Sequence, residues 1–309
     1  MDKLWTYLIH LSTNMWGDPG AKFLKPYFEK FATEDKVWRD VIDFLPQKGF
    51  NTLLIDLGDA IVYDSHPEIA VKGAWTKDKM KRELDYIRSV GLTPIPKLNF
   101  STGHDVWLGE YAKMVSTQKY YEVCADLIKE VAELFDSPEY FHLGMDEETE
   151  GDQKGYMLCT VRHGDLWWHD IYKLFDACDR SGVRPWVWAD RYWNHPKEYL
   201  EKMPKSVLQS NWWYGPIKRK EDGSYEDHRP GGYVDLSKAG YEQVLTASTW
   251  AYEFNYEETF QIARDELSPE SFKGVMAAPW QFTTMDYYYT LLNDAHRFNL
   301  AKEKYFPGV

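Results

Sequence analysis

The sequence is poor in cysteine, which excludes the usual covalent and metal-based ways of holding a small fold together. Its three cysteines are an odd number, and their spacing fits neither a disulfide framework nor a zinc site. Cys124 and Cys178 fall on the apolar faces of predicted helices, where a thiol packs as a small hydrophobe. We therefore expect a fold held by its apolar core, with no metal ion and no cofactor.

Excess positive charge and long apolar runs are also missing. The 309 residues include 49 acidic and 36 basic side chains, for a formal net charge of −13. Such a charge repels phosphate backbones and anionic lipids. No stretch approaches the ~20 uninterrupted apolar residues of a transmembrane helix. The sequence thus argues against nucleic-acid and membrane partners, and it leaves the oligomeric state open.

The first ten residues contain a short apolar run that has to be distinguished from a signal peptide. Asp2 precedes the run, His10 ends it, and no small-residue cleavage site follows. We therefore interpret this segment as the first β-strand. The compartment stays open between the cytoplasm and export with a leader that has been removed.

Aromatic residues, by contrast, are abundant, with 14 tryptophans and 22 tyrosines. Core packing accounts for most of them. Aromatic rings also stack on the C–H faces of sugars, and tyrosine and tryptophan add a polar group. The surplus indicates a carbohydrate, either a small molecule or an oligosaccharide, as the substrate.

One pattern recurs along the chain: an amphipathic helix, a glycine at its end, and then a short β run. The glycines are Gly49, Gly91, Gly182 and Gly240, and the β runs lie near 5–10, 51–57, 93–99, 140–145, 184–190, 206–212, 243–250 and 274–281. Eight alternating units predict an α/β fold, a single (β/α)8 TIM barrel over residues 1–309. A doubly wound open sheet is the alternative, but no glycine-rich phosphate loop follows the first strand.

In such a barrel, functional side chains stand at the C-terminal ends of the strands. In this sequence those ends carry acids, amides and aromatic residues: Asn14, Trp16, Asp56, Asp59, Asn99, His104, Asp146, Glu147, Trp188, Asp190, Trp212, Trp213, Trp250, Tyr252, Trp280 and Gln281. Acids and aromatic rings that converge on one opening are typical of a sugar pocket with a general acid.

Asp146 and Glu147 are the most informative of these residues, because two acids stand side by side where the fourth β run stops. Adjacent acids raise one another's pKa, which would keep one of them protonated. Neighbours in sequence do not easily flank a bond from opposite sides, so this motif does not supply the usual pair of acid and nucleophile. Two other interpretations are a pair that caps the following loop or pairs with surface cations, and a metal cluster with His142 and Glu148. The metal cluster is less favoured, because a histidine in an apolar strand is usually packed.

The stretch His142-Leu143-Gly144-Met145-Asp146-Glu147 resembles the His-x-Gly-Gly-Asp-Glu motif of glycoside hydrolase family 20, the β-N-acetylhexosaminidases. Weaker likenesses follow the family's order: His66-Pro67-Glu68-Ile69 with Gly73-Ala74-Trp75-Thr76 after the second strand, and Ile95-Pro96-Lys97-Leu98-Asn99 to Gly103-His104 after the third. The resemblance covers nearly all of the chain, although only the fourth-strand motif is specific by itself.

The resemblance implies a retaining hydrolase that removes terminal 2-acetamido sugars, with the substrate's own acetamido oxygen as the nucleophile and an oxazolinium ion as the intermediate. Glu147 would be the general acid and then the base, and Asp146 would orient the acetamido nitrogen. Tyr252 would hydrogen-bond the acetamido oxygen. Further substrate contacts would come from Trp188, Trp250, Trp280, Trp212, Gln281 and Asn14, and support behind the pair from His104, Asp59 and His142.

The sequence also departs from the family pattern at the sugar-binding positions. The family has an arginine at the end of strand one, where this chain reads Leu11-Ser12-Thr13-Asn14, and Gln281-Phe282 replaces the family's x-Glu after Trp280. Lys97 and Asn99 replace acids of the third-strand run. Losing a bidentate cationic clamp changes which hydroxyls are recognised. A glycosidase of the same fold with another sugar specificity, or a non-catalytic sugar-binding barrel, are therefore the alternatives.

Overall fold

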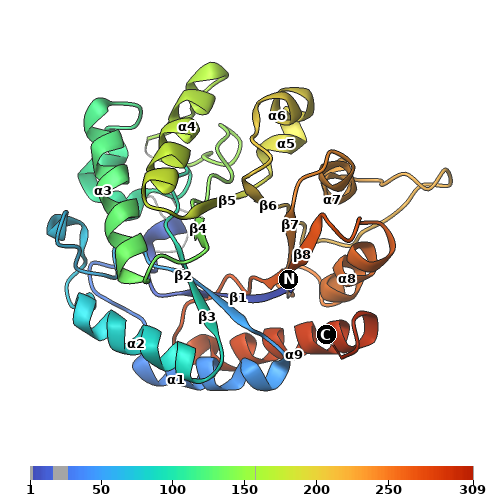
Figure 1. Ribbon diagram of the computed structural model, residues 1–309, viewed down its shortest axis with the longest axis horizontal. Coiled ribbons are helices and arrows are strands. Elements are labelled where there is room, and N and C mark those ends of the chain that lie inside the picture. The colour runs from blue at the N-terminus through green and yellow to red at the C-terminus, as the bar shows by residue number, and fades with distance from the viewer. Residues whose placement is uncertain (1–2, 17–26, 157, 309) are drawn as a thin grey trace.

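The computed structural model describes residues 3–16, 27–156 and 158–308. Eight parallel strands close into a barrel in the order β1 to β8 (Figure 1). They are β1 Leu4–His10, β2 Thr52–Asp56, β3 Thr93–Lys97, β4 Tyr140–His142, β5 Arg184–Trp188, β6 Leu208–Ser210, β7 Gln243–Ala247 and β8 Phe272–Ala277. The predicted (β/α)8 barrel is confirmed. Every strand after the first ends earlier than its predicted β run, because the polar residues beyond it already belong to loops.

Helices cover the outside of the barrel (Figure 1). They are α1 Asp35–Phe44, α2 Lys77–Ser89, α3 Gln118–Leu134, α4 Asp165–Arg180, α5 Arg191–Asn194, α6 Pro196–Lys202, α7 His228–Lys238, α8 Asn255–Asp265 and α9 Tyr288–Tyr305. Short 3-10 helices add η1 Asn14–Trp16, η2 Pro46–Lys48, η3 Pro67–Ile69, η4 Val106–Lys113 and η5 Met285–Tyr287. Gly91 and Gly182 take φ of 91° and 70° just before β3 and β5, which is the left-handed stop that the sequence predicts.

The apolar core has two parts. Inside the barrel, Leu8, Leu54 and Ile95 pack with Trp186 of β5. Between the strands and the helices lies a larger cluster of buried leucine, valine and aromatic side chains. Both predicted buried cysteines belong to this outer cluster, and burial raises the pKa of each thiol. They therefore act as packing residues, as expected.

The barrel closes where the first and last strands meet. Leu4 pairs with Gly274, and the register continues to Tyr7 and Ala277. A Cβ atom on Gly274 would lie 2.0 Å from the carbonyl oxygen of Leu4. Only glycine permits this close approach of two backbones.

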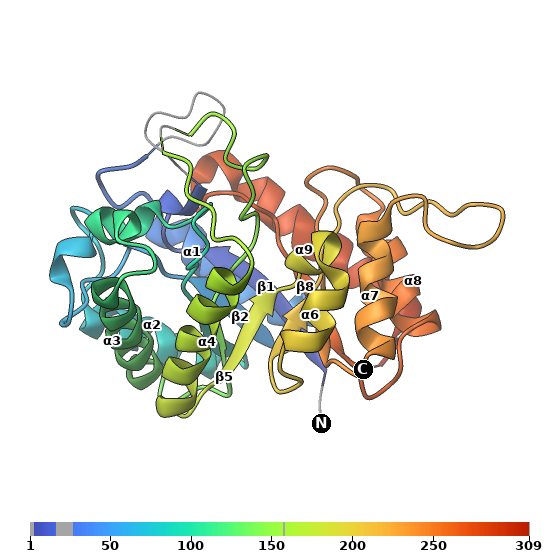
Figure 2. The ribbon, with the colours of Figure 1, turned by 90° about the horizontal axis from the view of Figure 1, so that it is seen from above.

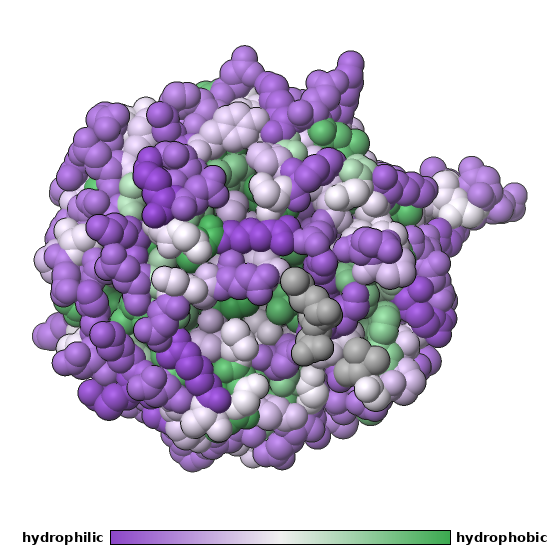
Figure 3. Space-filling model, viewed as in Figure 1, coloured by the Kyte–Doolittle hydropathy of each residue, from purple (hydrophilic) through white to green (hydrophobic). Residues whose placement is uncertain are grey.

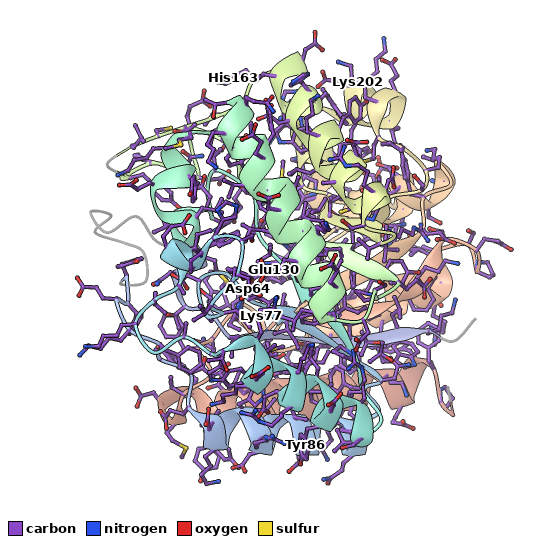
Figure 4. The ribbon with its side chains drawn as sticks, turned by 60° about the vertical axis from the view of Figure 1, so that its left-hand side comes forward. Asp64, Lys77, Tyr86, Glu130, His163 and Lys202 are labelled. Carbon is purple, nitrogen blue, oxygen red and sulfur yellow. The ribbon has the colours of Figure 1, made fainter. Side chains whose placement is uncertain are left out.

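Ion pairs join neighbouring units on the outside of the barrel. Glu130 on α3 accepts hydrogen bonds from the backbone N–H groups of Asp64 and Ser65, at 2.7 and 2.9 Å. The ammonium group of Lys77 lies 2.7 Å from Asp64 and 3.1 Å from Glu130 (Figure 4). This cluster ties the loop after β2 to α3, and so it fixes one side of the barrel mouth.

The long loops lie at the C-terminal end of the barrel, at the top of Figure 2. The segment between β4 and α4 rises there, and the segment between β6 and α7 extends to one side (Figures 1 and 2). The face seen in Figure 3 is mostly hydrophilic, with apolar side chains in small separate patches. Among the described residues, no helix is both long and apolar enough to cross a membrane.

Candidate active site

The chain turns sharply after β4, and this turn sets the direction of the two acids. Gly144 has φ of 72°, and a Cβ atom there would lie 1.9 Å from Oδ1 of Asn99. Met145 and Glu147 also adopt left-handed backbone, with φ of 80° and 54°. Such a conformation costs roughly 1–3 kcal/mol at a non-glycine residue and is typical of functional turns. Met145 stands at the second glycine of the resembling motif, yet it adopts a left-handed backbone.

Hydrogen bonds from β3 and β5 hold this turn. The amide of Asn99 donates to Oδ1 of Asp146 at 2.8 Å, and its oxygen accepts from the N–H of Met145 at 3.2 Å. On the other side, the backbone N–H of Glu147 donates to Oδ2 of Asp190 at 2.9 Å. Ser101 donates to the backbone carbonyl of Asp146. Asn99, which replaces an acid of the family pattern, therefore fixes the Asp146 carboxylate directly.

His104 joins the two acids. Its Nε2 lies 3.4 Å from Asp146 Oδ2 and 3.2 Å from Glu147 Oε2. Its Nδ1 lies 3.0 Å from the carbonyl oxygen of Met15, which only accepts, so Nδ1 carries a hydrogen. Burial alone would lower the pKa of His104, but the two carboxylates outweigh burial and raise it well above its ordinary value. The imidazole is therefore a cation between two acids.

The two acids differ in burial and in charge. The side chain of Asp146 is 9% exposed and that of Glu147 is 41% exposed. Burial would raise the pKa of Asp146, but His104 and Lys97, with the Asn99 hydrogen bond, hold it below its ordinary value. The expectation that the adjacent acids raise one another's pKa is thus wrong for Asp146, because the cations around it are stronger. Asp146 is an anion, and Glu147 faces the opening.

Asp190, at the end of β5, is a buried carboxyl beside the acid pair. Burial, and after it the charge of Asp146, raises the pKa of Asp190 well above its ordinary value. Its Oδ1 lies 3.4 Å from the indole nitrogen of Trp212. The sequence placed Asp190 at a strand end but gave it no role. Its contact with the Glu147 backbone crosses from β4 to β5, so only the folded barrel reveals it.

Aromatic rings line the mouth beside the acids. Trp188 and Trp280 lie 5.8 Å apart between ring centroids, and Trp280 lies 6.2 Å from Tyr214. Tyr214 stacks on Trp212 at 5.2 Å. Behind them, the ring of His142 packs on Trp188 at 4.6 Å. The structure thus brings together Trp188, Trp212 and Trp280, three of the four tryptophans expected in the pocket.

Tyr214 was not predicted from the sequence, because it lies four residues beyond the end of β6, where strand alternation no longer applies. The side chain is buried, and burial raises the pKa of its hydroxyl well above the ordinary value. The hydroxyl is among the buried polar groups for which the described residues supply no well-formed hydrogen bond.

Other expected residues lie elsewhere. Trp250 is 63% exposed, and the hydroxyl of Tyr252 lies 3.4 Å from Oε1 of Glu258. Gln281 is half-buried just beyond Trp280. The amide of Asn14 is committed to Asp59, at 2.7 Å, and to the backbone of Phe28.

Asp59 was expected beside His104. In the structure it accepts hydrogen bonds from the side chains of Ser12 and Asn14, both at 2.7 Å. Burial raises the pKa of Asp59 to about 6. The two residues expected to help bind and support the substrate therefore hold each other at the end of β1.

The floor of the site carries buried charge. Lys97 forms an ion pair with Asp56 inside the barrel, and Nδ1 of His10 lies 3.5 Å from the same carboxylate. Burial would raise the pKa of Asp56, but Lys97 and then His10 lower it. The positive charge of Lys97, which replaces a family acid, is thus neutralised by Asp56 at the end of β2.

The possible metal cluster can now be judged. Glu148 binds the buried Arg162 through several hydrogen bonds, and His142 packs on tryptophan rings. Among the described residues, the group whose ligand atoms lie within 4.8 Å of one another is His104, Asp146 and Glu147. The predicted cluster of His142 and Glu148 with the two acids is therefore not brought together among the described residues.

The fold has clear counterparts among solved structures. The chitobiase FjGH20 of Flavobacterium johnsoniae superposes with a TM-score of 0.63 at 18% identity over 87% of this chain. A β-N-acetylhexosaminidase of Bacteroides fragilis gives 0.65 at 14% over 96%. The N-acetyl-β-hexosaminidase of Streptomyces plicatus, solved with Thio-NAglucal, gives 0.64 at 17% over 96%. The chain therefore has the barrel fold of family 20 proteins, at low sequence identity.

This chain is shorter than the proteins it resembles. It covers 46% of the F. johnsoniae chain, 65% of the B. fragilis chain and 64% of the S. plicatus chain. No family model matches the sequence, and no curated protein matches it. The likeness is one of fold, and the function has to be argued from the site.

Proposed function

We propose that this barrel is a retaining exo-glycosidase that removes terminal 2-acetamido sugars by substrate-assisted catalysis. The observation that carries the proposal is the asymmetry of the acid pair: Asp146 is buried and ionised, whereas Glu147 reaches the opening. One carboxylate is thus suited to hold and polarise, and the other to exchange protons. The turn after β4 and the His104 contact support the same assignment.

In the first step, Glu147 donates a proton to the glycosidic oxygen as the bond from that oxygen to C1 breaks, and the bonding electrons leave with the oxygen. The acetamido oxygen forms a new bond to C1 and gives the oxazolinium ion. Asp146 accepts a hydrogen bond from the acetamido N–H and stabilises the positive charge. In the second step, Glu147 takes a proton from water as the water attacks C1 and the acetamido oxygen leaves, so the configuration is retained.

The aromatic rings supply the sugar-binding wall in this proposal. Trp188, Trp212 and Trp280 surround the position next to Asp146, where rings stack on sugar C–H faces. Tyr214 is the tyrosine that contacts this wall, and its hydroxyl, beside the Trp280 indole, would donate to the acetamido oxygen once the sugar is bound. We therefore assign to Tyr214 the role that the resemblance gave to Tyr252.

The test is hydrolysis of 4-nitrophenyl N-acetyl-β-hexosaminides by the wild type and by Glu147→Gln. Loss of the general acid should lower kcat/KM by about 10²–10⁴-fold. Glu150→Gln, on the same loop but exposed and paired with His163, is the matched control. Unchanged turnover in Glu147→Gln would refute the role. A thiazoline mimic of the oxazolinium ion should inhibit, and failure to inhibit would remove the substrate-assisted step.

The missing sugar clamp favours a second candidate, a glycosidase of the same fold with another sugar specificity. Asn14 lies near the position where the family has its arginine, and its side chain is hydrogen-bonded to Asp59 and to the backbone of Phe28. A panel of chromogenic glycosides decides: activity restricted to sugars without the acetamido group would favour this candidate. N-acetylglucosamine binding without hydrolysis, at high protein concentration, would instead favour a non-catalytic barrel.

A further inference from the structure

A cavity of about 320 Å³ opens beside Glu147 and Trp212. The loop after β4 forms one side of it, and the start of α5 and the first turn of α7 form the other. Trp212 of the proposed sugar-binding wall lines this cavity, whereas Trp188 and Trp280 are not part of its lining. Its volume lies in the range of small-ligand sites.

Most of the charges in the cavity are already balanced. Glu148 is bound by Arg162, and Arg229 makes two hydrogen bonds with Asp227. Asp190 accepts a hydrogen bond from the backbone N–H of Glu147, and Asp152 accepts one from the Thr149 hydroxyl. Glu147 also lines the cavity and has His104 at its other side.

Arg191 is the cation that lacks a close partner. Its side chain is 10% exposed, and its nearest carboxylate, Glu198, lies 3.7 Å away. Glu198 is shared with Lys202, whose ammonium group is closer to it, at 3.1 Å. The Nε of Arg191 is buried without a hydrogen bond from the described residues. Its guanidinium carbon lies 4.4 Å from the centroid of the Trp167 ring, and this cation–π contact helps to hold the side chain in place.

A largely buried guanidinium that lines a cavity and shares its nearest carboxylate binds carboxylates and phosphates in preference to neutral groups. The walls next to it are aromatic, since Trp193 meets Trp212 edge to face at 4.5 Å. A ring-shaped group with one oxyanion would therefore find both stacking surface and a counter-charge. The net charge of −13 elsewhere on the chain would repel such a group, so selection has to come from this cavity.

We infer that this cavity is the leaving-group subsite and that Arg191 makes it select a sugar that carries an oxyanion, such as the carboxylate of a uronic acid. This inference rests on the proposed function, because Glu147 must give its proton to the oxygen that joins the two sugars. The leaving group then lies on the cavity side of Glu147, and the acetamido sugar lies on the tryptophan side.

The experiment compares methyl β-glucuronide with methyl β-glucoside as ligands, followed by tryptophan fluorescence and by inhibition of 4-nitrophenyl N-acetyl-β-glucosaminide hydrolysis. The glucuronide should bind about tenfold more tightly, which is the effect of one charge-assisted hydrogen bond. Arg191→Gln should abolish the preference, and Arg191→Lys should keep part of it. Arg180→Gln, an exposed arginine at the end of α4, should keep all of it. Glucose 6-phosphate tests whether phosphate serves as the oxyanion.

The outcomes separate the two proposals. Equal binding of glucuronide and glucoside, or a preference that survives Arg191→Gln, overturns the subsite even if the chromogenic substrate is hydrolysed. Selective glucuronide binding without hydrolysis by the wild type overturns the proposed enzyme and keeps the oxyanion site. Circular dichroism and thermal unfolding of each variant exclude a folding defect, and Arg191→Lys gives the answer if Arg191→Gln does not fold.

Discussion

The two sides of the barrel mouth differ in how tightly they are built. On the side of β3, β4 and β5, Asn99, His104 and Asp190 hold the acid pair with hydrogen bonds and ion pairs between 2.8 and 3.4 Å. On the side of β7, Trp250 is exposed and Tyr252 turns to Glu258. The first side resembles the family pattern and the second does not. The proposed proton chemistry lies on the first side, and substitutions on the two sides test it separately.

The largest effect should come from the tight side. Asp146→Asn keeps the shape but removes the negative charge, and we expect kcat/KM on an acetamido substrate to fall about 10²–10³-fold. Steady-state kinetics measure it, with exposed Asp176→Asn on α4 as the control. A loss equal to that of the control would place the chemistry elsewhere.

The turn before Asp146 and Glu147 should not tolerate a methyl group at Gly144. Gly144→Ala meets Asn99 at 1.9 Å and adds a side chain at φ of 72°, so we expect a loss of about 3 kcal/mol or more in unfolding free energy. Gly182→Ala, with φ of 70° and nothing within 4 Å, isolates the cost of a left-handed backbone and should lose only about 1 kcal/mol. Urea unfolding compares them, and equal losses would contradict the close contact.

Asp59, on the side that lost the clamp, should give a pH signature. Its pKa is about 6 in the folded chain and near 4 when unfolded, so the folded state holds the proton more tightly. The resulting stabilisation is complete below pH 4 and is lost as pH rises through 6, by up to about 3 kcal/mol. Asp59→Asn should therefore show a smaller fall in unfolding free energy between pH 4 and 7. Parallel curves for both proteins would contradict this.

The smallest effect distinguishes the two tyrosines. Tyr214→Phe should lower kcat/KM on an acetamido substrate roughly tenfold, the worth of one hydrogen bond that strengthens in the reaction. Tyr252→Phe is the matched change on the looser side. A larger loss for Tyr252→Phe than for Tyr214→Phe would return the acetamido contact to the β7 loop and would contradict our assignment.

Much of the fold was predictable because it repeats locally. Helix periodicity and glycine stops such as Gly91 mark each unit, and eight units close a barrel by geometry. The direction of the acid pair was also local, since it depends on one turn. Asp190, Tyr214 and Arg191 were not assigned, because their contacts cross from one strand to the next. Trp250 was misplaced because β7 ends at Ala247, and a residue three positions beyond a strand no longer follows its alternation.

The closure of the barrel has a consequence for how the protein is made. β1 pairs with β8 from Leu4↔Gly274 to Tyr7↔Ala277, so its last partner is synthesised some 270 residues after β1 itself. Until then, one edge of an apolar strand stays unpaired, and such edges recruit other chains. A chain that terminates before Gly274 would therefore form an open sheet with an aggregation-prone edge, and it would not form a smaller closed barrel.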